Sequence, residues 1–156
     1  MSNTESIKLL RSETGAGVMD AKRALEEAND DFEKAKDILK EKGIADAEKR
    51  ASRATGQGVI ESYIHQGNRL GAIIEINCET DFVARTSEFK NLAKNLAMQV
   101  AAMDPASIDN DNDSLMEQQY IKDSDKLIKE LVQEVIAQTG ENIKIKRFQR
   151  FEVGGE

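Results

Sequence analysis

The chain has 156 residues, with 22 Lys and Arg against 29 Asp and Glu and a formal net charge of −7. This length accommodates one ordinary domain, or a small helical domain followed by a modest α+β core, and excludes larger architectures. The acidic balance argues against direct nucleic-acid binding, which requires clustered positive charge.

The composition also argues against membrane, metal and cofactor sites. The first residues, Met1 to Ser6, have neither the basic nor the apolar segment of a signal peptide, and no later stretch is apolar enough to span a bilayer. We therefore expect a soluble, cytoplasmic protein. One cysteine, Cys78, and one histidine, His65, cannot form the clusters that hold zinc or redox metals, so we expect no metal and no cofactor.

Helical periodicity begins at the start of the chain. Ser2 and Glu5 have the spacing of a capping box ahead of a first short helix, which ends at the turn 14–17. A second helix is expected over about 18–28.

A third helix and a linker are expected to follow. Asp30 and Glu33 repeat the capping pattern, and Gly43 is a suitable residue to end the third helix. The Ala-, Lys-, Arg- and Glu-rich stretch 44–54 reads as a helical linker. Residues 1–54 therefore predict a three-helix docking domain with its linker.

Residues 55–156 predict an α+β core. Two β-branched runs around the turn 66–69 indicate a β-hairpin, and alternate residues of the second run share one apolar face that needs a covering layer. We expect a three-stranded antiparallel sheet covered by helices. The predicted elements are the hairpin 57–78, the helices 87–103 and 125–138, and the strand 142–151.

The sequence lacks the motifs typical of nucleotide-binding and nucleophilic active sites. The glycine-containing turns 14–17 and 55–58 are not followed by the Gly-Lys-Ser/Thr of a phosphate-binding loop. His65 has no Ser or Cys placed near it by local spacing, and a surface or packing role suits it better. We therefore expect no enzymatic activity of the chain's own.

The segment after the second predicted strand combines an acidic and an aromatic residue, Asp81 and Phe82. Aromatic residues at strand ends are usually packed in the core, so the residues alone give a buried and an exposed Phe82 equal weight. Met19 poses the same question in the three-helix domain, where a core position and a surface position have equal weight.

Two segments resemble the signatures of the elongation factor Ts family. The first is 10–25, Leu-Arg-Ser-Glu-Thr-Gly-Ala-Gly-Val-Met-Asp-Ala-Lys-Arg-Ala-Leu, and the second is 80–85, Thr-Asp-Phe-Val-Ala-Arg. The segments 139–143 and 150–154 also match, so the resemblance covers nearly the whole chain.

The resemblance implies a guanine-nucleotide exchange factor that promotes release of guanosine diphosphate from elongation factor Tu. It implies that the first domain is ubiquitin-associated-like and docks on the GTPase domain, with Leu10, Val18 and Met19 as docking residues. It also implies that Thr80, Asp81, Phe82 and Val83 approach the magnesium and phosphate site, where the Phe acts as a wedge and helps displace Mg²⁺.

The chain departs from the family in sequence and in length. Val18-Met19 stands where the family has a methionine pair, and Thr86 stands where the family commonly has Asn. Many members have two core subdomains and this chain has room for one. We therefore expect it to resemble short members that rebuild the two-lobed core as a homodimer across a symmetric interface.

An interaction adaptor without exchange activity is the alternative. In that case the three-helix domain binds a partner helix and replacement of Phe82 has no effect.

Overall fold

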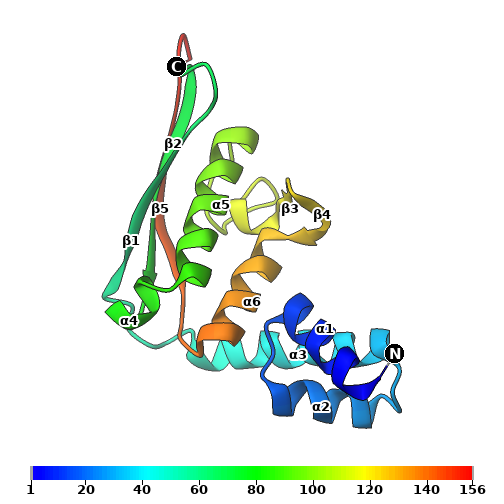
Figure 1. The fold of residues 1–156 in the computed structure, drawn as a ribbon. Coiled ribbons are helices and arrows are strands. Elements are labelled where there is room, and N and C mark those ends of the chain that lie inside the picture. The colour runs from blue at the N-terminus through cyan, green and yellow to red at the C-terminus, as the bar shows by residue number, and fades with distance from the viewer. Residues whose placement is uncertain (1, 156) are drawn as a thin grey trace. The chain divides into compact units, whose positions relative to one another are not determined.

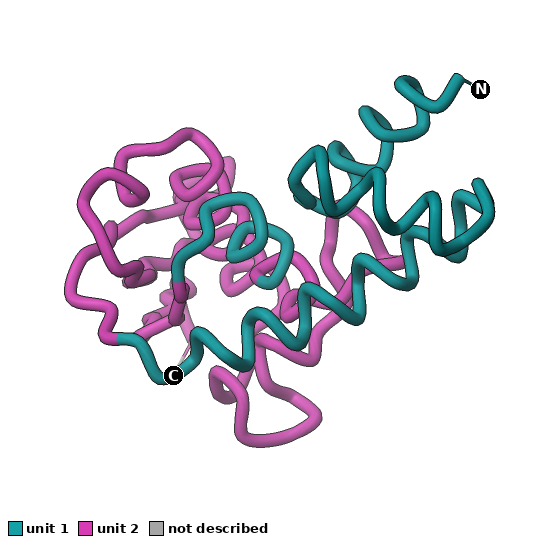
Figure 2. The backbone as a smooth tube through the Cα atoms, turned by 90° about the horizontal axis from the view of Figure 1, so that it is seen from below, with its two compact units in different colours: residues 1–53, 133–141 teal, residues 54–132, 142–156 magenta. Residues whose placement is uncertain are grey.

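The computed structural model describes residues 2–155, which form two compact units. Unit 1 comprises residues 1–53 and 133–141, and unit 2 comprises residues 54–132 and 142–156 (Figure 2). Residues 133–141 therefore group with the N-terminal helices, whereas the sequence assigned them to the core. Among the described residues, no helix has both the length and the apolar character needed to cross a membrane.

Unit 1 begins with three helices, α1 (Asn3–Thr14), α2 (Val18–Glu27) and α3 (Phe32–Arg50) (Figure 1). The capping box predicted ahead of α1 is confirmed, since Ser2 Oγ accepts the N–H of Glu5 and the Glu5 carboxylate accepts the N–H of Ser2. The three helices enclose a small core of apolar side chains. Its buried members are Leu10, Ala21, Ala24, Leu25, Ala28, Ala35 and Leu39.

Helix α3 differs from the prediction at both ends. Its N-cap is Asp31, whose side chain accepts the N–H of Lys34, because Asp30 takes a left-handed backbone with φ 62°. The helix does not stop at Gly43 but continues to Arg50. Gly43 keeps a helical backbone and the ion pair of Lys42 with Asp46 spans it, which favours a continuous helix.

Unit 2 is built on a three-stranded antiparallel sheet in the order β1-β2-β5, which confirms the predicted α+β class. The strands are β1 (Gln57–Ile64), β2 (Leu70–Cys78) and β5 (Lys144–Glu152), and β2 lies in the centre. One face of β2 carries the buried side chains of Ala72, Ile74, Ile76 and Cys78.

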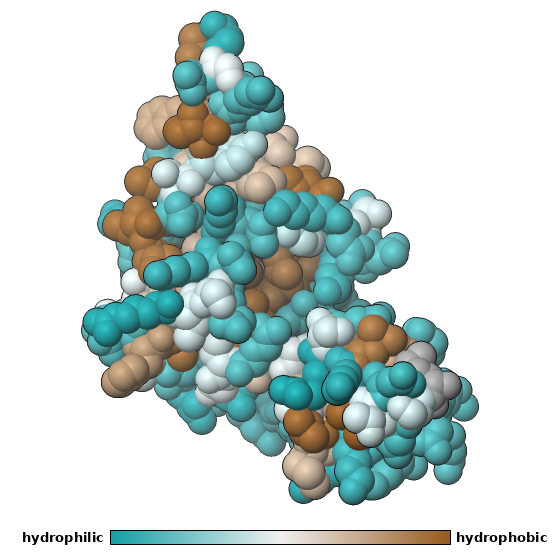
Figure 3. Space-filling view, viewed as in Figure 1, coloured by the Kyte–Doolittle hydropathy of each residue, from teal (hydrophilic) through white to brown (hydrophobic). Residues whose placement is uncertain are grey.

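Helix α5 (Ser87–Met103) packs on the sheet, as Figure 1 shows. Most of its apolar side chains are fully or almost fully buried, with Phe89, Leu96 and Val100 at 0% exposure, whereas Met103 at its C-terminal end is 48% exposed. The other face of the sheet remains exposed. Figure 3 shows apolar, brown side chains along the surface where Figure 1 draws β1 and β5.

Shorter elements that the sequence did not indicate complete unit 2. They are α4 (Asp81–Ala84), the single turn η1 (Leu115–Glu117), and a small hairpin of β3 (Gln119–Tyr120) and β4 (Asp123–Leu127). Buried Gln99 of α5 holds this hairpin, because its side chain accepts the N–H of Ile121 and donates to the carbonyl of Gln119.

Helix α6 (Ile128–Thr139) begins three residues later than the prediction of 125–138. Asp125 to Leu127 lie in β4, and the Glu130 carboxylate accepts the N–H of Leu127 at the junction. The final strand likewise runs over 144–152 rather than 142–151.

Candidate functional site

The segment after β2 turns sharply into α4 and carries the predicted site residues. Thr80 is the N-cap of this helix, with an extended backbone and a hydroxyl that accepts the N–H of Val83 at 3.3 Å. Asp81 and Phe82 are the first two helical residues. The short helix therefore projects these two side chains from the end of the central strand.

Phe82 is exposed. Its relative exposure is 77%, the highest among the large apolar side chains that are exposed in the described chain. This rules out the core interpretation, which the residues alone had left open. An exposed aromatic side chain costs hydration free energy unless a partner covers it, so this position is suited to intermolecular contact.

Asp81 lies beside Phe82 and has a cationic neighbour. Its carboxylate is 3.2 Å from the Arg85 guanidinium, one helical turn later, and its side chain is about half exposed. The tip of α4 thus presents the Phe82 ring next to the accessible ion pair of Asp81 and Arg85.

The C-terminal side of α4 leads directly into α5. Thr86 donates its hydroxyl to the carbonyl of Val83 at 2.7 Å and also caps α5 by accepting the N–H of Phe89. Thr is among the residue types that favour the N-cap position, which Thr86 occupies here.

The N-terminal side of α4 is anchored by residues that the site prediction did not include. The Glu79 carboxylate accepts the backbone N–H of Asn142 at 2.7 Å, and the Cys78 thiol donates to the carbonyl of Thr80 at 3.1 Å. The only signal for this anchor in the sequence was that 139–143 matched the same family as 80–85.

A second candidate surface lies at the start of α2 in unit 1. Gly15, with φ 72°, turns the chain out of α1, and Val18 and Met19 follow as the first residues of α2. Val18 is 49% and Met19 57% exposed, so Met19 is a surface residue rather than a core residue.

Leu10 is not part of this surface. Its side chain is 0% exposed and belongs to the core of the three helices. A residue without exposed surface cannot contact a partner directly, so Leu10 can contribute only by supporting the fold. The accessible apolar side chains near the turn are those of Val18 and Met19.

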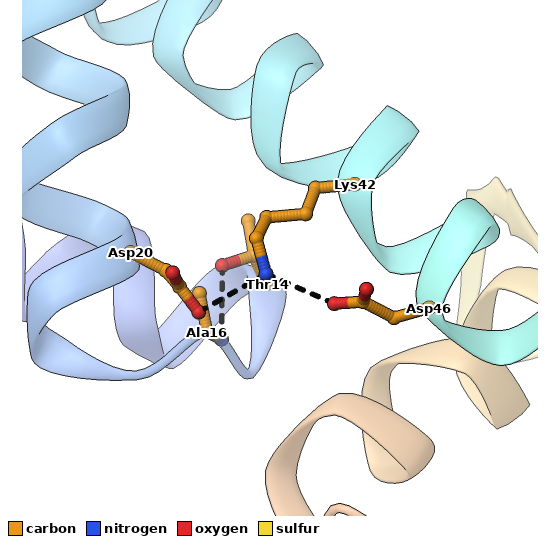
Figure 4. Close-up of polar contacts among 5 residues, drawn as sticks. All are labelled: Thr14, Ala16, Asp20, Lys42 and Asp46. Carbon is orange, nitrogen blue, oxygen red and sulfur yellow. Dashed lines mark hydrogen bonds and ion pairs between the residues drawn. The ribbon is translucent and has the colours of Figure 1, made fainter. Parts of the chain in front are cut away.

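A charged bridge fixes the first turn of α2 to α3 (Figure 4). The Lys42 ammonium lies between two carboxylates, 3.4 Å from Asp20 and 2.9 Å from Asp46. The hydrogen bond with Lys42 lowers the pKa of Asp46, and the same bond raises the pKa of Lys42. Asp20 directly follows Met19 in the chain, so this bridge helps to orient the exposed side chains of Val18 and Met19.

Other polar side chains do not gather into a further site. The His65 ring nitrogen Nδ1 is 2.8 Å from the Tyr63 hydroxyl on the same strand end. Within residues 2–155, no three His, Cys, Asp or Glu side chains converge as a metal site would require. The exposed apolar side chains of the two surfaces are Phe82 in unit 2 and Val18 and Met19 in unit 1.

Comparison with known proteins identifies the class further. A family model described as "Elongation factor TS" matches residues 15–112 and 79–156. The chain is 42% identical to "Elongation factor Ts" of Thermoanaerobacter sp. (strain X514), across 99% of this chain and 96% of the relative. It is 46% identical to "Elongation factor Ts" of Thermotoga neapolitana, with 96% of each chain covered. A chloroplastic "Elongation factor Ts" of Guillardia theta is 44% identical, across 97% of this chain and 89% of the relative.

The chain therefore belongs to the elongation factor Ts family. The alignment with the Thermoanaerobacter protein runs over 195 positions, more than the 156 residues of this chain. The relative thus contains residues inside the aligned region that have no counterpart here.

Proposed function

We propose that the chain accelerates release of guanosine diphosphate from elongation factor Tu, the activity that membership of the elongation factor Ts family implies. The observation that carries the proposal is the exposed Phe82 beside Asp81 at the tip of α4, within the segment 80–83 that resembles the family signature. The chain supplies no bond chemistry of its own and acts through its partner.

The mechanism follows from linkage between two ligands of one GTPase. Any factor by which the chain weakens nucleotide binding is also the factor by which the nucleotide weakens binding of the chain. In our proposal Phe82 and Asp81 insert near the phosphate and magnesium site, with Thr80 and Val83 holding the turn. The conformation of the GTPase that accepts the ring is one that holds Mg²⁺ and the nucleotide poorly.

The size of one aromatic contact limits what Phe82 contributes. Burial of a Phe side chain is worth about 1.5–3 kcal/mol, and about 1.4 kcal/mol corresponds to a tenfold change in an equilibrium. The ring thus accounts for roughly a tenfold to hundredfold weakening of nucleotide binding. Further loosening requires more contacts near the nucleotide site, whereas the exposed pair Val18 and Met19 is the proposed source of the energy that docks the chain on the GTPase.

Release of a fluorescent guanosine diphosphate from preloaded elongation factor Tu, followed by stopped flow, tests the proposal. We expect the wild-type chain to accelerate release with a saturable dependence on its concentration. Phe82→Ala should lower the maximal rate at least about tenfold and still bind the GTPase, because only the wedge is lost. Ile121→Ala, at a 40% exposed apolar position outside the proposed surfaces, is the matched control and should behave as wild type.

Two outcomes count against the proposal. If the wild-type chain binds the GTPase without changing the release rate, the interaction-adaptor alternative takes its place. If Phe82→Ala and Ile121→Ala reduce release equally, the wedge role of Phe82 is wrong even though exchange occurs.

The exposed face of the sheet in unit 2 supports a second proposal, that two copies of this chain associate through it. Its exposed apolar side chains come from all three strands: Ile60 and Ile64 from β1, Ile73 from β2 and Phe151 from β5. The register places Ile64, Gly71 and Phe151 side by side across the sheet. A second copy brings the same apolar set, so the two faces complement each other around a two-fold axis.

The family model offers independent support for a two-lobed core. Residues 79–112 fall in both matched ranges, as expected if the model contains two segments of this type. In our proposal a second copy of the chain supplies the second lobe.

Sedimentation at micromolar concentration tests the association. We expect a dimer for wild type and a monomer for Ile73→Glu, which places charge at the central strand of the exposed face. Ile121→Glu carries the same change outside this face and should remain dimeric. A monomeric wild type would contradict the proposal.

A further inference from the structure

The structure brings together two sequence segments that are far apart in the chain. Glu79 directly follows the last residue of the central strand β2, and Asn142 lies between α6 and β5. The hydrogen bond from the Asn142 N–H to Glu79 Oε1, at 2.7 Å, links them across 63 residues. Both residues belong to unit 2.

The surroundings of this bond make it a strong anchor. Asn142 is 3% exposed, so its N–H has little access to water if the carboxylate is removed. A hydrogen bond to an ionised acceptor is worth more than a neutral one, and an unsatisfied buried N–H carries a desolvation penalty. Loss of the Glu79 carboxylate therefore disfavours the arrangement seen here.

The anchor acts at the point where the predicted site begins. Glu79 precedes Thr80, the N-cap of α4, and the Cys78 thiol holds the carbonyl of Thr80 at 3.1 Å. Helix α4 has four residues, and so short a helix does not persist without contacts to the rest of the fold. The direction in which Phe82 projects thus depends on how the chain is fixed at 79–80.

From this geometry we propose that Glu79 is a positioning residue for the exchange reaction. Its carboxylate, bound to the Asn142 N–H, fixes the start of α4 so that Asp81 and Phe82 reach the partner in one orientation. The inference rests on the proposed exchange function. It assigns the segment around Asn142 a role in holding Glu79.

Three substitutions separate the hydrogen bond from the charge. Glu79→Gln keeps the length of the side chain and an oxygen that can accept the N–H, but removes the charge. Glu79→Asp keeps the charge but is one methylene too short to reach Asn142 from the same backbone. Glu79→Ala removes both, and Glu117→Ala is the control, since Glu117 pairs with Lys129 on an exposed surface.

Two readouts are measured on the full chain. The first is the maximal rate and the half-saturating concentration for release of fluorescent guanosine diphosphate from elongation factor Tu. The second is amide hydrogen exchange of the chain alone at Asn142 and at Arg85 and Thr86, whose N–H groups bond to the carbonyls of Asp81 and Val83.

We expect Glu79→Ala and Glu79→Asp to lower the maximal rate about tenfold while the half-saturating concentration changes less than about twofold. Glu79→Gln should retain most of the rate. Protection of Asn142, Arg85 and Thr86 should fall in the Ala and Asp variants and persist in the Gln variant.

Other results overturn the inference. If Glu79→Asp retains the rate and Glu79→Gln loses it, the charge acts directly on the partner and the anchor role is wrong. If Glu79→Ala alters only the half-saturating concentration, or nothing, Glu79 does not position the site. If the wild-type chain fails to accelerate release, the exchange proposal fails, and hydrogen exchange alone decides whether Glu79 anchors α4.

Discussion

Gly15 occupies a position in unit 1 that admits no side chain. Its backbone is left-handed, with φ 72°, and a Cβ there would lie 2.6 Å from the carbonyl oxygen of Glu134 in the α6 segment of the same unit. Backbone atoms cannot move aside as the end of a flexible side chain can. The turn that leads to Val18 and Met19 therefore requires glycine for two independent reasons.

Gly43 is the natural comparison, because it lies within α3 with open space around it. We expect Gly15→Ala to lower the free energy of unfolding by at least about 1 kcal/mol, through backbone strain and steric overlap. Gly43→Ala should raise it by about 0.5–1 kcal/mol, because alanine favours a helix interior. Urea unfolding of both variants measures the two effects, and equal signs would contradict the structure.

The residues of the two family motifs differ in their exposure to solvent. Leu10 matched the docking motif but is buried, whereas Met19 and Phe82 matched their motifs and are exposed. A motif records which residues occur together and does not distinguish a side chain that contacts a partner from one that supports it.

Helices α2 and α3 are joined by the charged bridge at Lys42 in addition to their apolar core. The pKa of Asp46 is lowered from its ordinary value of 3.8, so the bridge stabilises the fold fully above that value. The contribution is lost as the pH falls through the lowered pKa. The pKa of Lys42 is raised from 10.5, so on the alkaline side the contribution is lost only as the pH rises through that raised value.

This argument predicts a pH-dependent effect of Lys42→Met. Because both carboxylates are partly exposed, the variant should be less stable than wild type by at most about 1 kcal/mol between about pH 5 and pH 9. The difference should shrink as the pH falls through the lowered pKa of Asp46, because the protonated carboxyl no longer attracts the Lys42 ammonium. Urea unfolding across this range checks it, with Lys22→Met as the control because the pair of Lys22 and Glu26 lies on one exposed helix face. A difference that persists undiminished at acid pH would mean that Lys42 acts through its apolar stem.

The boundaries of α3 and α6 differ from those that hydrophobic periodicity predicted. Helix α3 continues past Gly43, and α6 begins after the short β-strand that takes its expected first turn. A specific bond lies at each of these positions, namely the pair of Lys42 and Asp46 and the bond of Glu130 to the N–H of Leu127, and each favours the boundary that is observed.

At the scale of the molecule, the two proposed partner surfaces lie in different units. Val18 and Met19 belong to unit 1, and Asp81 and Phe82 belong to unit 2. If the first pair supplies docking energy and the second acts on the nucleotide site, changes in the two surfaces affect different kinetic parameters.

Replacement of Val18 and Met19 together by alanine tests this division. We expect the half-saturating concentration for exchange to rise about tenfold or more, with the maximal rate within about twofold of wild type, because binding and not the wedge is weakened. Combined with Phe82→Ala, the effects on the ratio of the maximal rate to the half-saturating concentration should multiply, since the two surfaces lie in different units. Stopped-flow release with each variant measures both parameters. A fall in the maximal rate from the docking variant alone would show that the surfaces do not act separately.

The amino-acid sequence by itself determined the local features of this protein. The capping box of Ser2 and Glu5, the hairpin, the apolar face of β2 and the helix over 87–103 all follow from spacing within a few residues, and the structure confirms them. The family also followed from the sequence, because its two signature segments are each continuous.

Tertiary structure alone decided which motif residues are accessible and which distant residues meet. Phe82 and Leu10 have similar hydrophobicity, yet one is 77% and the other 0% exposed, because exposure depends on what packs around a residue rather than on its neighbours in the chain. The bond of Glu79 to Asn142 spans 63 residues and follows no local period. It exists because the sheet places the end of β2 beside the start of β5, which only the folded chain brings together.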